Sequence, residues 1–284
     1  MKILVLGASG MLGSAVLRVM AETGSHDVFA TARSAGVKRH FRPELAERII
    51  CGVDVENFDA LAAVFSAFRP QVVINCIGLV KQLAEVDDPL LALPINSLLP
   101  HRLARLCSLV EARLVHISTD CVFNGRKGNY RESDLSDAED FYGKTKFLGE
   151  VQQPNSITLR TSIIGHELQS AHGLIDWFLS QKGRCDGYTR AFFSGVPTVV
   201  LARIIRDVVI PLPALFGVYH VAAQPISKYD LLKLVARIYG KDIEISADDK
   251  VVIDRSLDAG RFLAATGYAP PDWPELIQTM NNYK

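Results

Sequence analysis

The sequence predicts an α/β fold in which a doubly wound parallel sheet is followed by a smaller C-terminal α/β region. Two observations support this prediction. Short apolar runs rich in β-branched residues alternate with helical segments through residues 1–160, and a glycine-rich turn directly follows the first run. Strands that alternate with helices form a parallel sheet covered on both faces. We expect 1–160 to form the main domain, with a return of the chain near 196–222, and 161–284 to form the smaller region.

The expected elements follow one another at short intervals. Six runs are short and apolar enough to be buried strands: 3–6, 28–30, 49–51, 72–74, 114–117 and 157–159. Helical spacing of apolar residues marks the segments between them: 11–21, 58–68, 95–109 and 142–151. The later elements are helices at 202–209, 228–239 and 257–266 and a strand at 217–221. No internal repeat or long linker separates the halves, so we expect the second to cap the first.

The composition is that of an ordinary globular protein. Of 284 residues, 49% are hydrophobic and 22% are charged, which allows a sizeable core. Lys plus Arg equals Asp plus Glu, so the zero net charge argues against general binding to nucleic acid or an anionic membrane. No run reaches the ~18–20 apolar residues of a membrane span. The N-terminal run lacks the features of an export leader, so we expect no membrane association.

The cysteines indicate the compartment. There are five, an odd number, and they are scattered without C-x-x-C spacing. We expect reduced thiols and a cytoplasmic protein. Neither the cysteines nor the seven histidines show the grouping of metal ligands, so we expect no tightly bound metal.

The turn after the first strand reads Gly-Ala-Ser-Gly-Met-Leu-Gly and opens a helix. Such glycines allow a tight turn and a close backbone approach to a pyrophosphate, which faces the free N–H groups of the helix. Glycines also occur in plain turns, but this turn lies between a buried strand and an amphipathic helix, as a dinucleotide site requires. We predict a Rossmann-like site with cofactor contacts from Gly7, Ser9, Gly10, Met11, Leu12 and Gly13.

The end of the second strand favours NADP(H) over NAD(H). An acidic residue there would meet a free ribose 2′-hydroxyl, whereas this chain has Arg33 and Ser34, which can hold a 2′-phosphate. The alternative is that Arg33 is a solvated loop residue. Asp54 and Val55 follow the third strand, where Asp54 either accepts from the adenine amine or caps the next helix.

A Thr, Tyr and Lys constellation indicates ketone reduction or its reverse. Tyr142 and Lys146 are four residues apart on a predicted helix, so their side chains share a face. A neighbouring ammonium is expected to lower the Tyr pKa, which suits proton exchange at a carbonyl oxygen. Thr119 ends a central strand and can orient the same oxygen. Tyr and Lys at this spacing occur on many helix faces, so the prediction depends on all the motifs together.

In this order, the motifs resemble those of the extended short-chain dehydrogenase/reductase superfamily, most closely the dTDP-4-dehydrorhamnose reductase family. The resemblance runs nearly end to end, through the glycine turn and the segments 118–125, 142–146, 160–162, 195–198, 217–220 and 271–273. It implies a Rossmann domain with a small substrate domain, and hydride transfer from NADPH to the C4 carbonyl of a nucleotide-linked sugar. It also implies Thr119, Tyr142 and Lys146 as the catalytic trio and further cofactor contacts from Cys76, Ile77, Gly78, Asn96, Ser118, Tyr142 and Lys146.

Departures from the family pattern lie on the sugar side. Ile163 stands where the family has Trp, and Lys81 lies in a Val-Lys-Gln-Leu-Ala-Glu stretch that replaces Val-Asp-Lys-Ala-Glu. Both differences suit another sugar, for example a UDP-linked N-acetylated 6-deoxy-4-keto hexose. Arg190 and Arg255 either bind the pyrophosphate of the sugar nucleotide or are solvated. The candidate substrate contacts are Lys81, Asp120, Val122, Phe123, Ile163, Arg190 and Arg255.

Competing functions remain open at this stage. A dehydratase of this superfamily places Asp-Glu after the Thr, whereas Asp120 and Cys121 follow Thr119 here, so elimination is disfavoured. A 4-epimerase uses the same trio, and some relatives are NADP-binding regulatory subunits without catalysis. The intact trio favours an enzyme, for which we expect a nucleotide-sugar substrate and a role in polysaccharide or cell-envelope sugar biosynthesis. The sequence leaves a homodimer open.

Overall fold

The computed structural model describes residues 1–81, 84–169 and 171–283. It contains a seven-stranded sheet in which every neighbouring pair is parallel. The strands lie in the order β11 (Gly217–His220), β6 (Ser156–Thr161), β5 (Arg113–Thr119), β4 (Val72–Asn75), β1 (Lys2–Leu6), β2 (Asp27–Ala32) and β3 (Ile49–Cys51). The predicted doubly wound α/β architecture is therefore confirmed.

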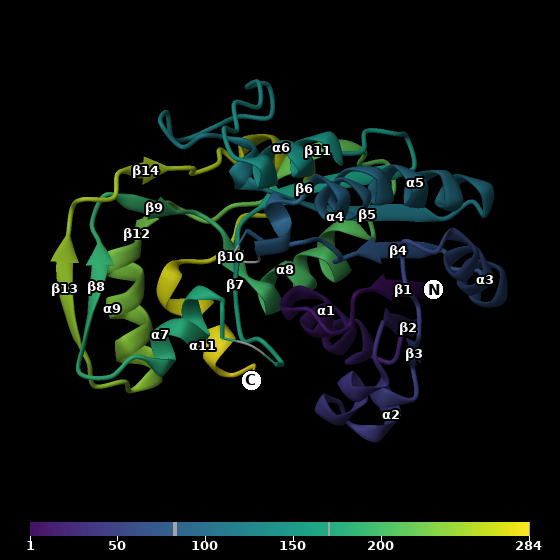
Figure 1. Ribbon diagram of the computed structural model, residues 1–284, viewed down its shortest axis with the longest axis horizontal. Helices are drawn as coiled ribbons and strands as arrows, with labels where there is room; N and C mark the ends of the chain where they lie inside the picture. The colour runs from purple at the N-terminus through teal and green to yellow at the C-terminus, as the bar shows by residue number, and fades with distance from the viewer. Residues whose placement is uncertain (82–83, 170, 284) are drawn as a thin grey trace.

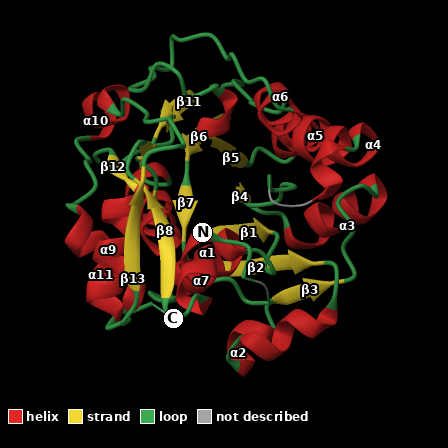
Figure 2. Ribbon diagram, turned by 60° about the vertical axis from the view of Figure 1, so that its left-hand side comes forward, coloured by secondary structure: helices red, strands yellow, loops and turns green. Residues whose placement is uncertain are grey.

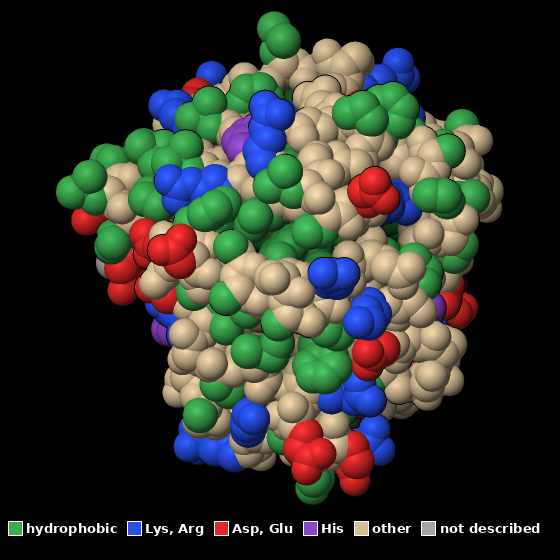
Figure 3. Space-filling model, turned by 90° about the vertical axis from the view of Figure 1, so that its right-hand side faces the viewer, with side chains coloured by type: hydrophobic (Ala, Val, Ile, Leu, Met, Phe, Trp, Pro, Cys, Tyr) green, Lys and Arg blue, Asp and Glu red, His purple; other side chains and the backbone are tan. Residues whose placement is uncertain are grey.

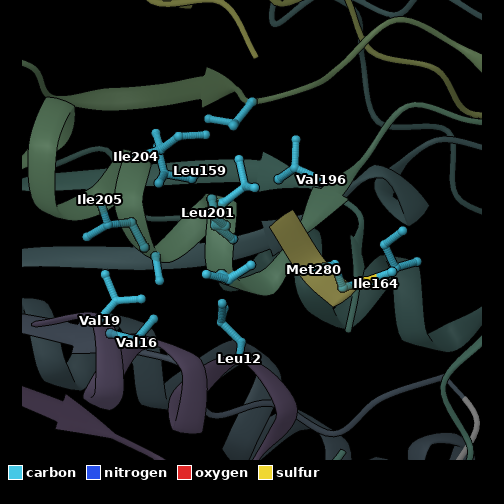
Figure 4. Packing of buried hydrophobic residues seen from close by; sticks show 14 of the residues in the cluster. Leu12, Val16, Val19, Leu159, Ile164, Val196, Leu201, Ile204, Ile205 and Met280 are labelled. Atoms are coloured by element: carbon cyan, nitrogen blue, oxygen red, sulfur yellow. The ribbon is translucent and has the colours of Figure 1, made fainter. Parts of the chain in front are cut away.

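Helices cover both faces of this sheet (Figure 1). One face packs against α1 (Met11–Ala21) and the continuous segment α8 (Thr198–Ile204) and η5 (Ile205–Val209). Figure 4 shows this layer, in which apolar side chains of α1 meet those of α8 and η5. The opposite face packs against α3 (Phe58–Phe68) and α5 (Leu99–Leu109), with α6 (Phe141–Leu148) beside them.

Side chains alternate between the two faces along each strand, which explains why helices must cover both faces of the sheet. Ile3 and Val5 belong to the cluster beneath α1, whereas Leu4 and Leu6 belong to the cluster beneath α3 and α5. Successive side chains of a strand point to opposite faces, so a strand that is apolar throughout must be covered on both sides. The remaining helical turns of the main domain are η1 (Ala35–His40), α2 (Pro43–Ala46), η2 (Ala84–Asp87), α4 (Pro89–Ala92), η3 (Leu93–Leu98) and η4 (Asp120–Val122).

The second half adds small sheets to the main sheet, and Figure 2 shows the long strands of one of them apart from β1, β2 and β3. β8 (Arg184–Tyr188) pairs with β13 (Glu244–Asp248), and β7 (Ile163–Ile164) pairs with β10 (Val196–Pro197). The strands β12 (Ile226–Ser227), β9 (Ala191–Phe193) and β14 (Ile253–Asp254) form the third small sheet. The helices of this region are α7 (Leu174–Ser180), α9 (Lys228–Tyr239), α10 (Gly260–Thr266) and α11 (Trp273–Asn281).

Four predicted helices differ in their boundaries from the structure. The helix expected at 202–209 starts earlier, at Thr198. The helix expected at 95–109 starts at Pro89, after Asp88 accepts a hydrogen bond from the Leu90 amide, and contains the π-helical segment η3. The helix expected at 142–151 ends at Leu148. The helix expected at 257–266 starts at Gly260, because residue 257 instead bridges to Tyr130. Such differences arise from tertiary contacts that local spacing does not encode.

On the face of the molecule that Figure 3 shows, basic and acidic side chains are interspersed. Within the part of the chain that the structure describes, no helix has both the length and the apolar character needed to cross a membrane.

A buried ion pair joins neighbouring strands near the carboxyl end of the sheet. The Arg160 guanidinium donates from Nε and Nη2 to the two carboxylate oxygens of Glu150, each at 2.7 Å. Both side chains are almost fully buried, at 4% and 2% exposure. Ser118 also donates to Glu150 at 2.7 Å, and Arg160 Nη1 lies 3.3 Å from His220 Nε2. The pair therefore connects β5, β6, β11 and the loop after α6.

Removing one partner should be costly, because the other charge then stays buried without a counter-ion. We expect Glu150→Ala to lower the free energy of unfolding by about 3–5 kcal/mol in urea denaturation. The control is Glu139→Ala, whose exposed ion pair with Arg126 should contribute no more than about 1 kcal/mol. If the two variants lost the same free energy of unfolding, the buried pair would be no more important for stability than the exposed one.

Candidate active site

The glycine turn forms a cradle that fits a pyrophosphate. Gly7 has a φ of +95°, and a Cβ on Gly13 would lie 1.9 Å from the Gly7 carbonyl oxygen. The turn is closed by a hydrogen bond from the Gly10 amide to that oxygen at 3.1 Å. Gly10 precedes α1 without a side-chain cap, so the first N–H groups of the helix have no side-chain acceptor there. This geometry is what an anion at a helix N-terminus requires.

The other residues of the turn differ in exposure. Ser9 and Gly10 are exposed and Met11 is half-buried, whereas Leu12 is buried in the core cluster beneath α1. Leu12 can therefore contribute backbone atoms to a cofactor site, but its side chain belongs to the core.

The residues predicted to select the cofactor lie at the ends of β2 and β3. Arg33 and Ser34 are exposed, and Ser34 accepts a hydrogen bond from the Gly36 amide at 3.2 Å. Asp54 is exposed and accepts from the Glu56 amide at 3.1 Å, while Val55 is buried. The alternative that Asp54 caps the next helix is wrong, because Asn57 is the capping residue of α3.

The loop after β4 lies against both the glycine turn and α6. The Cys76 amide donates to the Leu6 carbonyl at 3.1 Å, and a Cβ on Gly7 would lie 2.9 Å from Ile77 Cγ1. A Cβ on Gly78 would lie 3.3 Å from Asn96 Oδ1 and 3.6 Å from Lys146 Nζ. Burial raises the pKa of the Cys76 thiol to about 12, so this thiol is neutral. Cys76 and Ile77 thus lie against the glycine turn, and Gly78 lies beside Lys146.

Asn96 holds this loop in place. Its Oδ1 accepts from the Leu79 amide at 2.9 Å, and its Nδ2 lies 3.3 Å from both the Leu79 carbonyl and Thr145 Oγ1. Only 1% of Asn96 is exposed. The side chain therefore joins the loop after β4 to α6. Ser118, also predicted to contact cofactor, directs its hydroxyl to Glu150 instead.

Thr119, Tyr142 and Lys146 come together at the carboxyl end of β5. Asp140 caps α6 by accepting from the Gly143 amide at 2.7 Å, and this helix carries both Tyr142 and Lys146. The Thr119 hydroxyl donates to Asp120 Oδ1 and accepts from the Cys121 amide, each at 3.1 Å, and it favours a lower pKa of the Tyr142 phenol. Lys146 Nζ donates to the Ile117 carbonyl at 2.8 Å, and burial lowers its pKa to about 8, opposed by the Glu150 carboxylate.

The expectation of a lowered Tyr142 pKa is wrong for this structure. Burial raises the pKa of the phenol, and Cys121, Asp120 and Asp140 add to the rise. Thr119 opposes it, while Lys146 donates its hydrogen bond to the Ile117 carbonyl. Tyr142 is therefore a neutral phenol, the form that can donate a proton.

Three cations and two carboxylates surround this cluster. Lys81 Nζ lies 2.6 Å from Asp140 Oδ2, and Arg255 Nη2 lies 4.0 Å from the same oxygen. Burial raises the Asp120 pKa, while Arg255 and Lys228 act in the opposite direction. Lys228 begins α9, and burial lowers its pKa. The sequence reasoning missed Lys228, whose only local signal is a basic residue following the helix-capping Ser227.

The remaining candidates for substrate contact are placed differently. Val122 and Phe123 are fully buried, and Phe123 stacks on Tyr130 with ring centroids 4.2 Å apart. Their side chains therefore cannot touch a sugar, although the Phe123 carbonyl accepts from Arg255 Nε at 2.7 Å. Ile163 is half-buried in β7, and Arg190 is exposed in the turn before β9. Across residues 1–81, 84–169 and 171–283, no three His, Cys, Asp or Glu side chains are grouped to hold a metal ion.

The fold and this cluster define an oxidoreductase of the short-chain dehydrogenase class. The model of one family, described as the RmlD substrate binding domain, matches residues 1–251, and the chain belongs to that family. The match covers the cradle, the trio and most of the smaller sheets.

The known proteins that are similar to the chain include a reductase and a subunit of an adenosyltransferase. A dTDP-4-dehydrorhamnose reductase of Aggregatibacter actinomycetemcomitans is 25% identical over 309 residues, covering 99% of both chains. The methionine adenosyltransferase 2 subunit beta of Pongo abelii is 26% identical over 248 residues, which is 83% of this chain and 71% of the relative. A crystal structure of dTDP-4-dehydrorhamnose reductase from Bacillus anthracis in complex with NADP has a TM-score of 0.81. At 20% identity over 100% of this chain and 98% of the other, it shows the shared fold.

The lowered pKa of Lys146 predicts a stability that rises with pH. Between the folded pKa of about 8 and the usual Lys value of ~10.4, the unfolded chain binds a proton that the folded chain does not. The free energy of unfolding should therefore gain up to about 1.4 kcal/mol per pH unit from this residue. Urea denaturation at several pH values measures it, as the difference between the protein and Lys146→Met. The exposed Lys144→Met is the control, and a difference for Lys146→Met that stays flat above pH ~8 would contradict the burial effect.

Proposed function

We propose that the protein is an NADPH-dependent reductase of the C4 keto group of a nucleotide-linked 4-keto-6-deoxy sugar, similar to dTDP-4-dehydrorhamnose reductase. The observation that carries the proposal is the position of Lys146, which shares α6 with Tyr142. Its Nζ donates to the Ile117 carbonyl, two residues before Thr119, and lies beside Gly78 in the loop that borders the glycine cradle. A role in polysaccharide or cell-envelope sugar biosynthesis follows from that substrate class.

The proposed mechanism divides the work among the three side chains. The bound nicotinamide supplies hydride chemistry. Tyr142 gives its phenolic proton to the oxygen that gains charge at the carbonyl, and Thr119 orients that oxygen. Lys146 holds the nicotinamide ribose, since its Nζ is buried beside Gly78 at the border of the cradle.

A second candidate substrate is a UDP-linked N-acetylated deoxy sugar, reduced or epimerised at C4. The observation in its favour is Lys81, whose Nζ lies with Arg255 around Asp140 at the edge of the site. Such a pair of cations suits the diphosphate of either nucleotide, and Lys81 supports the second candidate because the chain departs from the family pattern there. A regulatory subunit without catalysis is the alternative of another class, in view of the similarity to methionine adenosyltransferase 2 subunit beta. The assembled trio favours catalysis over that alternative.

We propose NADP(H) as the cofactor in preference to NAD(H). The exposed Arg33 guanidinium and the Ser34 hydroxyl at the end of β2 can meet a 2′-phosphate. Among similar structures, the Bacillus anthracis protein carries NADP. The Bordetella bronchiseptica enzyme WbmG, with a TM-score of 0.78 and 19% identity, carries NAD.

We also propose a separate role for each of the two regions of the chain. Residues 1–160, joined by β11 in the main sheet, would bind the cofactor, and 161–284 would supply the substrate side through Arg255 and Lys228. All five cysteines are free, which supports a cytoplasmic setting. A homodimer remains a proposal that requires a measurement of molecular mass in solution.

The main test is reductase activity on a defined panel. Purified protein with NADPH should oxidise the cofactor with one of the dTDP-, UDP- or GDP-linked 4-keto-6-deoxy sugars, followed by the loss of absorbance of the reduced nicotinamide. Tyr142→Phe should lower kcat at least ~100-fold while keeping NADPH affinity, because only the proton donor is lost. The half-buried Tyr268→Phe serves as the control and should keep its rate. Tight NADPH binding without turnover of any sugar would instead support the regulatory alternative.

Cofactor choice has a separate test. Arg33→Ala should weaken NADPH binding about tenfold or more, because a charged hydrogen bond to the 2′-phosphate is lost, and should leave NADH binding unchanged. Fluorescence titration with each cofactor measures both affinities. Arg39→Ala, an exposed cation in the adjacent η1, is the matched control. An equal loss for NADPH and NADH would argue that Arg33 does not contact the 2′-phosphate.

A further inference from the structure

We propose that His116 is a positioning residue for the loop after β4. Its Nδ1 atom fixes the orientation of the Asn75 amide, and that amide holds Ile77 against the glycine cradle. This role rests on the proposed function, in which the cradle and the loop border NADP(H). His116 is fully buried and has no part in the proposed chemistry.

Asn75 and His116 are neighbours in the sheet. Asn75 ends β4 and is the register partner of His116 in β5, so the two side chains lie on the same face. Asn75 Nδ2 lies 3.1 Å from His116 Nδ1, and Asn75 Oδ1 accepts from the Ile77 amide at 3.1 Å. Both side chains belong to residues with 0% exposure, so bulk water cannot substitute for either contact.

The Ile77 amide decides which end of the Asn75 side chain faces the ring. A backbone N–H needs an acceptor, so the amide oxygen faces Ile77 and the NH2 group faces His116. Because an NH2 group only donates, His116 Nδ1 must carry a lone pair, and a neutral ring then has its proton on Nε2. Burial, followed by the charges of Lys146 and His101, lowers the His116 pKa well below its usual value, which keeps the ring neutral.

Packing alone gives no reason for a histidine at this position. Among the described residues, His116 Nε2 has no hydrogen-bond partner, and an unpaired buried donor is unfavourable. A leucine would bury no such atom. The feature of the imidazole that an apolar side chain of similar size cannot supply is therefore the acceptor at Nδ1.

Loss of that acceptor should reach the cradle through Asn75. The Asn75 NH2 group would then be buried and unpaired, and the amide could relieve this only by turning toward other acceptors. Such a turn withdraws its oxygen from Ile77. Ile77 packs so closely on Gly7 that a Cβ there would lie 2.9 Å from Ile77 Cγ1. A displaced Ile77 therefore changes the wall of the cradle.

Substitutions that place an acceptor differently test this role. The side-chain oxygen of Asn can take the place of Nδ1 in His, whereas that of Gln lies one bond further along. In fluorescence titration, His116→Asn should keep NADPH affinity within about threefold, and His116→Gln should weaken it about tenfold or more. His116→Leu should resemble His116→Gln. The KM for NADPH should rise with the loss of affinity, while the KM for the sugar stays unchanged.

The control is a buried polar residue on the other side of His116. Thr158 in β6 is also its register partner, is fully buried and exchanges hydrogen bonds with the backbone of Val151. Thr158→Val removes these bonds without reaching the loop after β4, so NADPH affinity should remain. Equal losses of affinity for His116→Asn and His116→Gln, or the same loss for Thr158→Val, would overturn the positioning role. The comparison of Asn with Gln stands even if His116→Leu does not fold.

A measurement without cofactor or sugar tests the coupling itself. Nitrogen-15 NMR of the histidine rings, assigned by the signals that His116→Asn removes, should show a neutral His116 with its proton on Nε2 between about pH 6 and pH 8. Asn75→Leu removes the donor, so the Nδ1 signal should move toward that of a nitrogen without a hydrogen bond. A proton on Nδ1, or an Nδ1 signal unchanged in Asn75→Leu, would contradict the proposal.

The two proposals fail in different ways. If the protein binds NADPH and meets these expectations but reduces no sugar, the proposed function is overturned and the role of His116 stands. If the protein reduces a sugar but His116→Gln binds NADPH normally, the role of His116 is overturned and the proposed function stands.

Discussion

The ion pair between Glu150 and Arg160 is the interaction on which the arrangement of the active site depends. It fixes the chain at the exit of α6 against β6, and it receives the hydroxyl of Ser118, which directly precedes Thr119. Its negative member also favours the charged form of Lys146. A desolvated guanidinium and carboxylate contribute little net stability as a pair, but they tolerate only the geometry in which both are satisfied. The position of the trio is one consequence of that constraint.

Arg160 extends this set of contacts to β11, the strand at the edge of the sheet. Its contact with His220 reaches β11, where the His220 amide donates to Glu132 at 2.8 Å and the ring lies against the Tyr130 carbonyl. Burial, followed by the charge of Arg160, lowers the His220 pKa to about 4, so the ring is neutral and adds no second positive charge. Segments far apart in the sequence are in this way joined by one set of polar contacts.

Local spacing was sufficient to predict the sheet, the cradle and the placement of Tyr142 and Lys146 on one helix. These features depend on periodicity and on the backbone freedom of Gly7, which residues close in sequence determine. The direction of the Tyr142 pKa shift was not predictable in this way. It depends on burial and on Asp120 and Asp140, which tertiary structure brings to the phenol. The burial of Phe123 and the position of Lys228 were not predictable for the same reason. Tertiary contacts decide which way the side chain points, both in the irregular segment at Phe123 and at the first residue of α9.

The π-helical segment η3 limits how the length of this part of the chain can change. A π-helical turn holds one residue more than an α-helical turn, so it shifts every residue beyond it by about 100° around the helix axis. Asn96 lies in this segment, where it joins the loop after β4 to α6. Loss of a single residue between Leu93 and Leu98 would restore a regular helix and rotate that amide away from both partners. The length of this segment, as much as the identity of any side chain in it, is therefore part of the design of the site.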